Sequence, residues 1–236
     1  MKKMIVTSMV MLMVFAGVSS AAVLRVDFNG YNSEDVPFDN VAATATTLPG
    51  LLGTGTFWNG LEVSYETPNT ISAVYPGPAL LLEDGVTDSQ VSIALSGFDV
   101  ADSYESDNLV YKDYLLDVGD KGTPVEGTIT ISGLVPGNAY NLAGYGSNGD
   151  AGYGAIWMAN GSDPLDLRYP PAQGGENEGV IPDVLADASG VITIQLTSPG
   201  SIIIANGFEL EGTFVPEPMT IGLLSLGRLS LLRRRR

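Results

Sequence analysis

Glycine, proline, asparagine and aspartate interrupt this chain at short intervals, and this dense punctuation limits the folds that it can adopt. The 29 glycines and 14 prolines separate short runs rich in Val, Ile, Leu, Thr and Tyr. Such runs, bounded by turn-forming residues, are typical of short strands in an all-β domain. Between the two chain ends, no segment sustains a 3.6-residue apolar period over three turns. The sequence therefore predicts a β-sandwich.

The predicted elements follow from these runs. The predicted strands are Val23–Phe28, Leu61–Tyr65, Ala79–Leu82, Val91–Leu95, Glu126–Ser132, Ala139–Tyr145, Tyr153–Ala159, Val191–Thr197 and Ser201–Glu211. The last of these is expected to be a buried strand that bends at Gly207, because glycine inside a strand often marks a bend. Leu109–Asp117 is predicted to form one short helix.

The clearest unit runs from Gly127 to Leu142. Ile129 and Ile131 alternate with threonines, which places one face of this strand in a core. Pro136-Gly137 then has the residue order of a type II turn, and the next strand begins at once. We therefore predict a hairpin-like or sheet-crossing corner here, and a second turn at Asp187–Gly190.

The N-terminal end has the three regions of a secretory signal peptide. Two lysines follow Met1, an apolar run extends from Met4 to Val18, and small residues occupy Ser19–Ala22. This run is short for a permanent membrane span, which needs about 20 apolar residues. Residues 1–22 are therefore predicted to be a helical signal peptide, cleaved near Ala21 or Ala22.

The C-terminal end consists of Pro216-Glu217-Pro218, an apolar stretch from Met219 to Leu232, and four arginines, Arg233, Arg234, Arg235 and Arg236. This order resembles the PEP-CTERM sorting signal of bacteria that use an exosortase. The resemblance implies a short hydrophobic helix inserted transiently in the inner membrane and a membrane protease that cuts near Pro-Glu-Pro. The terminal arginines fit a cytoplasmic end by the positive-inside rule.

One position departs from that pattern. Arg228 interrupts the apolar stretch, and a central arginine opposes insertion by about 2.5 to 3.5 kcal/mol on a translocon scale, less where it can reach the interface. The predicted organisation is a signal peptide at residues 1–22, a β-sandwich domain at 23–214 and a sorting tail at 215–236.

A succession of aromatic, acidic and glycine-containing segments runs through the predicted domain: Val26-Asp27-Phe28, Phe57–Gly60, Asp88-Ser89, Lys112–Leu115, Gly133–Gly137 with Tyr140, and Asn206–Leu210. In this succession the body resembles a family of secreted PEP-CTERM proteins from planctomycete-like bacteria. The resemblance implies a jelly-roll sandwich of the galactose-binding type and an exported location, without defining a molecular activity.

The formal charge of −16 is distributed unevenly. Seven of the eleven basic residues lie in the two end segments, so that in the body four basic residues oppose 26 of the 27 acidic ones. A body with this surplus of negative charge repels nucleic acid and anionic membranes. Its acidic side chains are interpreted first as a solvated surface.

The residue types exclude several chemistries. Cysteine and histidine are both absent, so disulfides, thiolate metal sites and a Ser-His-Asp triad are excluded. Carboxylates are plentiful, and a glycosidase needs only two of them about 5 to 10 Å apart. No catalytic residue is predicted, but a carbohydrate-active hydrolase with paired carboxylates is retained as an alternative function.

Calcium is the bound ion that the composition favours, because hard oxygen ligands abound and soft ligands are absent. The candidate ligands are Asp99, Asp102, Glu105 and Asp107. They do not have the spacing of an EF-hand, and ordinary exposed loop acids are the alternative interpretation. No other cofactor is expected, and a calcium-stabilised scaffold is the third function considered.

Glycan binding would need aromatic side chains beside amide or charged groups, because rings stack on sugar C–H faces while polar groups bind hydroxyls. The residues that satisfy this description are Trp58, Asn59, Tyr145, Tyr153, Arg168 and Tyr169. Trp58 has an alternative interpretation as a packed side chain, because Phe57 and Leu61 beside it are apolar. Trp157, between Ile156 and Met158, is predicted to lie in the core.

Taken together, the sequence predicts an exported structural or adhesive protein of the cell envelope or extracellular matrix that is not an enzyme. Its expected partners are an exosortase-type membrane protease and extracellular polysaccharide, with transient insertion of the tail in the inner membrane.

Overall fold

A computed structural model of the chain describes residues 21–31, 50–53, 57–64, 74–75, 80–98, 100–103, 113–118, 124–146, 154–168, 177–199 and 202–214. All regular structure in these segments is β-strand. No helix in this described part is long and apolar enough to cross a membrane. The predicted sorting motif, Pro216 to Pro218 with Arg233 to Arg236, lies outside the described residues, as does nearly all of the predicted signal peptide.

The strands, in chain order, are β1 (Ala22–Tyr31), β2 (Asn59–Ser64), β3 (Val74–Tyr75), β4 (Ser92–Ser96), β5 (Val100–Ser103), β6 (Asp113–Val118), β7 (Val125–Ser132), β8 (Ala139–Tyr145), β9 (Ile156–Ala159), β10 (Leu165–Asp166), β11 (Glu178–Leu185), β12 (Val191–Ser198), β13 (Ile202–Ala205) and β14 (Gly207–Gly212).

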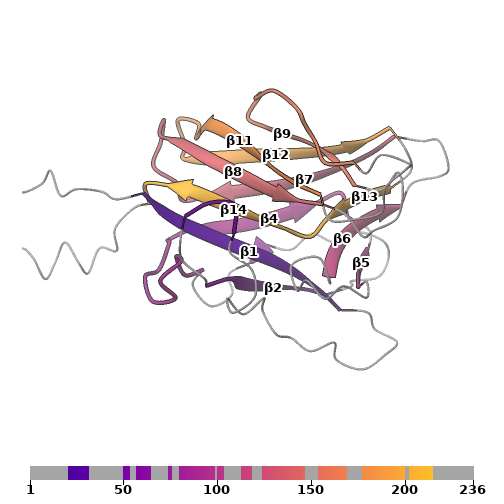
Figure 1. The fold of residues 1–236 in the computed structure, drawn as a ribbon, viewed down its shortest axis with the longest axis horizontal. Coiled ribbons are helices and arrows are strands. Elements are labelled where there is room, and N and C mark those ends of the chain that lie inside the picture. The colour runs from indigo at the N-terminus through magenta and orange to yellow at the C-terminus, as the bar shows by residue number, and fades with distance from the viewer. Residues whose placement is uncertain are drawn as a thin grey trace, which may run out of the picture.

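Two sheets form the sandwich (Figure 1). One sheet has the order β11-β8-β14-β1-β2, the other has the order β10-β9-β12-β7-β4-β3, and a smaller sheet contains β13-β6-β5. From β7 onward the chain alternates between layers, since β7, β9 and β12 belong to one sheet and β8, β11 and β14 to the other. This alternation gives an all-β sandwich of the jelly-roll type.

The core lies between the two sheets and follows directly from the alternation of side chains. In β7, Ile129 and Ile131 are fully buried, whereas Thr128 and Thr130 are only half-buried. The same cluster includes Phe28 of β1 and Leu142 of β8. The prediction that one face of β7 packs in the core is confirmed.

The corner after β7 also has the predicted geometry. Gly137 has φ of 72°, and the Asn138 amide donates to the Val135 carbonyl at 3.2 Å, as a type II turn with glycine at its third position requires. Because β7 and β8 belong to different sheets, the sheet-crossing alternative is the one realised. The predicted Asp187–Gly190 turn is also present, closed by a hydrogen bond from the Gly190 amide to the Asp187 carbonyl.

The predicted helix at Leu109–Asp117 is wrong wherever the chain is described there. Asp113–Val118 forms β6, which pairs with β5 on one side and β13 on the other. An isolated helix of nine residues is unstable in water, whereas a strand between two partners has neighbours for its amides and carbonyls on both sides. Tertiary pairing therefore overrides the local preference.

Three predicted strands differ from the observed elements in their limits or continuity. Ala79–Leu82 contributes only isolated bridges, Leu24 with Leu82 and Leu81 with Asp88, and Ala79 is not among the described residues. The strand predicted from Tyr153 begins at Ile156 instead. The long run predicted as Ser201–Glu211 is divided at Asn206 into β13 and β14, so that a break occurs beside the expected glycine.

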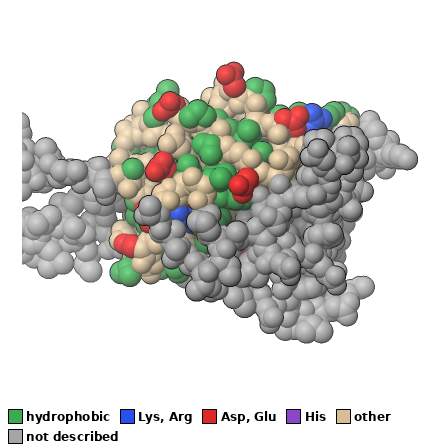
Figure 2. Space-filling view, in the orientation of Figure 1, with side chains coloured by type: hydrophobic (Ala, Val, Ile, Leu, Met, Phe, Trp, Pro, Cys, Tyr) green, Lys and Arg blue, Asp and Glu red, His purple; other side chains and the backbone are tan. Residues whose placement is uncertain are grey.

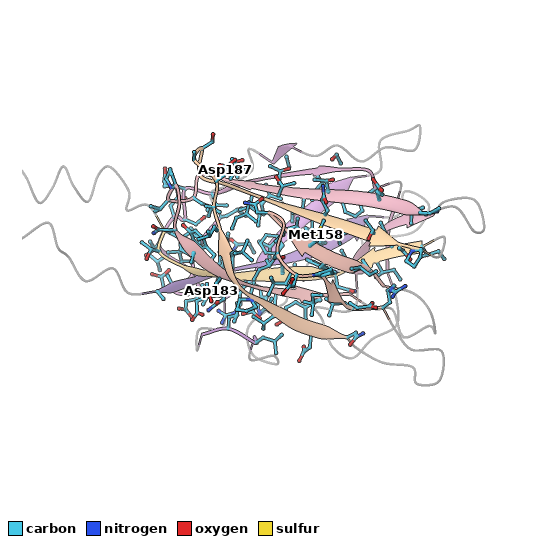
Figure 3. All side chains as sticks on the ribbon, turned by 90° about the horizontal axis from the view of Figure 1, so that it is seen from above. Met158, Asp183 and Asp187 are labelled. Atoms are coloured by element: carbon cyan, nitrogen blue, oxygen red, sulfur yellow. The ribbon has the colours of Figure 1, made fainter. Side chains whose placement is uncertain are left out.

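The edge strand β11 was not predicted, because Pro182 and Asp183 interrupt its run. The structure accommodates both residues in an irregularity, where the register with β8 shifts between Ile181 and Val184. Asp183, labelled in Figure 3, has φ of 54° at this point. Proline has no amide hydrogen to donate, so within a sheet it is tolerated at an edge or a bulge, where the ladder does not need that donor.

Two turn glycines, Gly137 after β7 and Gly190 before β12, provide a matched test of the packing between these turns. Gly190 and Gly137 have nearly equal positive φ values, 73° and 72°. A Cβ added to Gly190 would lie 2.2 Å from the Leu134 carbonyl oxygen, whereas one added to Gly137 would meet nothing within 4 Å. Both alanine variants carry the left-handed strain of about 1 to 2 kcal/mol, but only Gly190→Ala also forces the backbone apart.

We expect Gly190→Ala to lower the free energy of unfolding by at least about 2 kcal/mol more than Gly137→Ala does. Urea denaturation with comparable m-values for the two variants is the measurement. Equal losses from the two substitutions would contradict the close approach of Gly190 to Leu134.

Candidate functional site

A cluster of polar side chains lies on the outer face of the five-stranded sheet, away from the main core. In β1, Leu24 and Val26 point into the main core and Arg25 lies between them on the opposite face. Arg25 is directly opposite Glu209 of β14 in the register, and β14 in turn pairs with β8, which ends at Tyr145. Three adjacent strands therefore place Arg25, Glu209 and Tyr145 together.

Glu209 is the centre of this cluster and is completely buried. Its carboxylate accepts hydrogen bonds from Arg25 Nε at 3.0 Å, from the Leu51 amide at 2.6 Å and from the Leu52 amide at 3.2 Å. The Tyr145 hydroxyl donates a further, short hydrogen bond to it. Leu51 and Leu52, which belong to none of the strands of this sheet, are thus attached to it through the Glu209 carboxylate.

Arg25 is also fully buried. Its Nη2 donates to the Leu52 carbonyl at 2.5 Å, and its Nη1 lies 3.6 Å from a carboxylate oxygen of Glu83. Nη1 has no hydrogen-bond partner of its own. A buried ion pair of this kind depends on its additional hydrogen bonds, because desolvation of both charges offsets much of their attraction.

An apolar cluster surrounds these charges. Val23, Leu52, Trp58, Ala143 and Tyr145 form a second hydrophobic cluster, separate from the main core. The rings of Trp58 and Tyr145 meet edge to face, with centroids 5.7 Å apart. Trp58 is 3% exposed, and its indole Nε1 has no hydrogen-bond partner.

The segment Gly50–Gly53, which we call the strap, covers this cluster. A Cβ on Gly50 would lie 2.2 Å from Glu209 Oε2, so the strap backbone passes directly over the carboxylate. Gly53 has φ of 65° and approaches the Val23 side chain. The Leu52 side chain packs inward, while Leu51 is 40% exposed. Glycine is required at Gly50 because no side chain would fit there.

Burial raises the pKa of the Tyr145 hydroxyl, and the neighbouring Glu209 carboxylate adds to this effect because it opposes a second negative charge. Tyr145 therefore stays protonated and remains a donor to Glu209 across the physiological pH range.

The structure brings together some of the predicted glycan-binding residues and separates others. Trp58 and Tyr145 are in contact, but with 3% and 4% exposure they offer no free face to a sugar ring. The packed interpretation of Trp58 is confirmed, as is the core position of Trp157, which is 0% exposed.

Asn59 has a structural role. Its side-chain amide donates to the carbonyls of Arg25 and Leu81 and accepts from the Leu81 amide, each at 2.8 Å. These bonds tie the start of β2 to the segment at Leu81, which leaves little capacity for a ligand. Asn59 therefore fixes the backbone beside Trp58.

Arg168 is half-buried and is bound by Asp166, with Nη2 2.5 Å from the carboxylate. This pairing lowers the pKa of Asp166 and raises that of Arg168. Tyr153 and Tyr169 lie outside the described residues.

The calcium candidates are mostly outside the described residues too. Asp99, Glu105 and Asp107 are not described, and Asp102 is placed only as a backbone position in β5. Among the described residues, no group of three carboxylates could hold a metal ion.

The sequence reasoning did not single out Arg25 and Glu209. A signal was available for Arg25, because it is one of four basic residues in the acidic body and lies in an alternating strand between Leu24 and Val26. Its partner could not be identified, because 26 carboxylates were equally available in the sequence. Only the register of β1 with β14 selects Glu209.

Comparison with known proteins assigns this chain to no family. No protein-family model matches the chain, and no curated protein matches it either. Among solved structures, the enzymatically active domain of bacteriophage CBA120 tailspike protein 4 aligns with 53% of this chain at 15% identity and a TM-score of 0.29. The aligned part is 19% of that tailspike chain.

A second solved structure, TmCBM61 in complex with β-1,4-galactotriose, aligns with 54% of this chain and 83% of its own, at 9% identity and a TM-score of 0.26. Neither likeness assigns a fold family or a function to this chain.

Proposed function

We propose that this chain is an exported structural or adhesive protein of the cell envelope or extracellular matrix, sorted through its C-terminal segment by an exosortase-type protease. The observation that carries the proposal is the pairing of Ala22 with Gly212, the first residue of β1 and the last of β14. The predicted signal peptide and the predicted sorting tail therefore join the sandwich at the same end.

This arrangement suits a protein that is held at a membrane and then released. The described strands end at Gly212, four residues before the Pro-Glu-Pro motif begins at Pro216. Cleavage near Pro216 would remove no described strand. β14 lies in the middle of its sheet, so the sandwich keeps all of its strand pairings after the tail is lost.

The surface is consistent with an extracellular role. On the face shown in Figure 2, acidic side chains are scattered over the described residues, with few basic groups among them. A large net charge of one sign keeps a protein soluble and prevents self-association. It also disfavours binding to nucleic acid, which is itself anionic.

Glycan binding is the more specific form of this proposal. It is favoured by the contact between Trp58 and Tyr145 beside Arg25 and Glu209, since an aromatic pair next to a carboxylate and a guanidinium has the chemistry of a sugar site. These residues lie under the strap, so recognition at this place requires the strap to move.

The four terminal arginines provide a test of sorting in the native host. We expect replacement of Arg233–Arg236 by alanine to abolish retention of the precursor at the inner membrane, because the positive charges hold the tail in the cytoplasm. Pulse-chase labelling with membrane fractionation follows the precursor. Arg228→Leu is the matched control, since it removes an arginine but improves the apolar stretch. Unchanged retention in the four-alanine variant would contradict the proposal.

A further inference from the structure

We propose that the cluster beneath the strap is a binding site for a hydroxyl-rich ligand of the carbohydrate class, and that the strap covers this site until a ligand displaces it. The inference rests on the glycan-binding form of the proposed function and adds to it a location and a gate. The floor of the site consists of Arg25, Tyr145, Glu209 and Trp58.

The strap supplies the floor with the same kinds of groups that a sugar has. Its Leu51 and Leu52 amides donate to the two oxygens of Glu209, as two neighbouring hydroxyls can. Its Leu52 carbonyl accepts from Arg25 Nη2, as a hydroxyl or ring oxygen can. The carboxylate and the guanidinium can bind the hydroxyls at the polar edge of a sugar, and the aromatic pair can pack against its apolar face.

Two buried donors of this floor make no hydrogen bond, although Arg25 Nη1 lies 3.6 Å from a carboxylate oxygen of Glu83. Arg25 Nη1 and Trp58 Nε1 both lack a hydrogen bond, although Arg25 is 0% and Trp58 3% exposed. Buried N–H groups are satisfied in the great majority of native structures. A third exception, Trp157 Nε1, lies in the main core, whereas these two donors belong to the floor beside a buried ion pair. A ligand with several oxygens has acceptors to offer where the strap does not, and this difference favours displacement of the strap.

The floor is built on paired strands, whereas the strap is held to it by hydrogen bonds to side chains and by one buried leucine. Arg25, Glu209 and Tyr145 lie on three strands that pair with one another. Trp58 is followed by Asn59, whose side chain is fixed by three hydrogen bonds.

The strap, by contrast, has a glycine at each end, Gly50 and Gly53, and buries a single apolar side chain, that of Leu52. A short segment with glycines at its ends can rotate away while the paired strands keep their geometry.

The two tryptophans of the chain make a direct test possible, because Trp58 lies under the strap and Trp157 in the main core. The full chain is labelled with 5-fluorotryptophan in a detergent without a sugar headgroup, and the two fluorine resonances are assigned with Trp58→Phe and Trp157→Phe. Neutral gluco-, galacto- and manno-oligosaccharides are then titrated. We expect at least one of them to shift the Trp58 resonance and leave that of Trp157 in place.

Leu52→Ala removes the apolar anchor of the strap without altering the floor. Because apparent affinity scales with the fraction of open molecules, this variant should bind the same oligosaccharide about tenfold more tightly. Leu185→Ala is the matched control, since Leu185 is exposed on β11, away from the strap. It should bind with the wild-type affinity.

Three results would overturn the inference. Tighter binding by Leu185→Ala as well would show that the effect does not come from the strap. Binding detected by calorimetry without a shift at Trp58 would place the glycan elsewhere and leave glycan binding itself intact. An absence of binding in both wild type and Leu52→Ala, with the Trp157 resonance in its native position, would reject this site together with the glycan-binding form of the proposed function.

Discussion

Replacement of Glu209 by alanine is expected to lower the free energy of unfolding by about 3 to 5 kcal/mol, the usual loss when one partner of a buried ion pair is removed. The substitution leaves the Arg25 guanidinium buried without its counter-charge. It also removes the acceptor for the Leu51 and Leu52 amides and for the Tyr145 hydroxyl. Urea denaturation of the variant and the wild type measures the difference.

A double variant separates the charge from the packing. Arg25→Met with Glu209→Leu replaces both charges by apolar side chains, and such replacements of buried ion pairs are often neutral or stabilising. We therefore expect the double variant to recover at least half of the stability lost in Glu209→Ala. If Glu209→Ala lost less than about 1 kcal/mol, the value for an exposed pair, the cluster would not be buried as the structure has it.

Replacement of Trp157 by alanine is expected to lower the free energy of unfolding by about 3 to 5 kcal/mol, as for other large-to-small changes in a core. Trp157 is among the largest fully buried side chains of the described residues. It packs under Gly144 of β8, where an added Cβ would lie 3.0 Å from the indole ring. Its Nε1 has no hydrogen bond, so the loss arises from packing rather than from a broken polar contact.

Met158 is the matched control for this change, because it is the next residue of β9 and lies half-buried on the opposite face (Figure 3). Met158→Ala should lower the free energy of unfolding by about 1 kcal/mol, the typical effect of a single substitution. Thermal or urea unfolding of the two variants provides the comparison. Similar losses for Trp157 and Met158 would mean that β9 does not turn its tryptophan toward the core.

Local sequence signals predict those parts of the fold that depend on neighbouring residues. The alternation of Ile129 and Ile131 in β7 and the Pro136-Gly137 turn are both local, and both are confirmed. The limits of β8 are the predicted ones. These features can be recognised from the sequence because the two-residue alternation of a strand and the residue preferences of a turn do not depend on distant partners.

The errors lie where distant partners decide the structure. Asp113–Val118 is a strand because β5 and β13 lie on either side of it, and these two strands come from chain segments before and after it. β11 is a strand despite Pro182 because β8 provides an edge on which a bulge is tolerated. In both cases the local preference favoured another state and the pairing overrode it.

The candidate site shows the same division. Trp58 and Tyr145 could be selected from the sequence as aromatic residues near polar ones. Their burial could not be predicted, because it depends on the position of the strap, Gly50–Gly53, over the sheet. The pairing of Arg25 with Glu209 spans 184 residues of sequence. No local pattern connects two positions so far apart, and only the adjacency of β1 and β14 does so.

The mass of the mature protein isolated from the native envelope tests the central claim most directly. The account predicts that the wild-type protein lacks Met219–Arg236, and that a variant with alanine at Pro216, Glu217 and Pro218 accumulates at the inner membrane with this tail attached. A mature and correctly located wild-type protein that still carries its terminal arginines would contradict the account, since the C-terminal segment would then be a permanent part of the protein rather than a sorting signal.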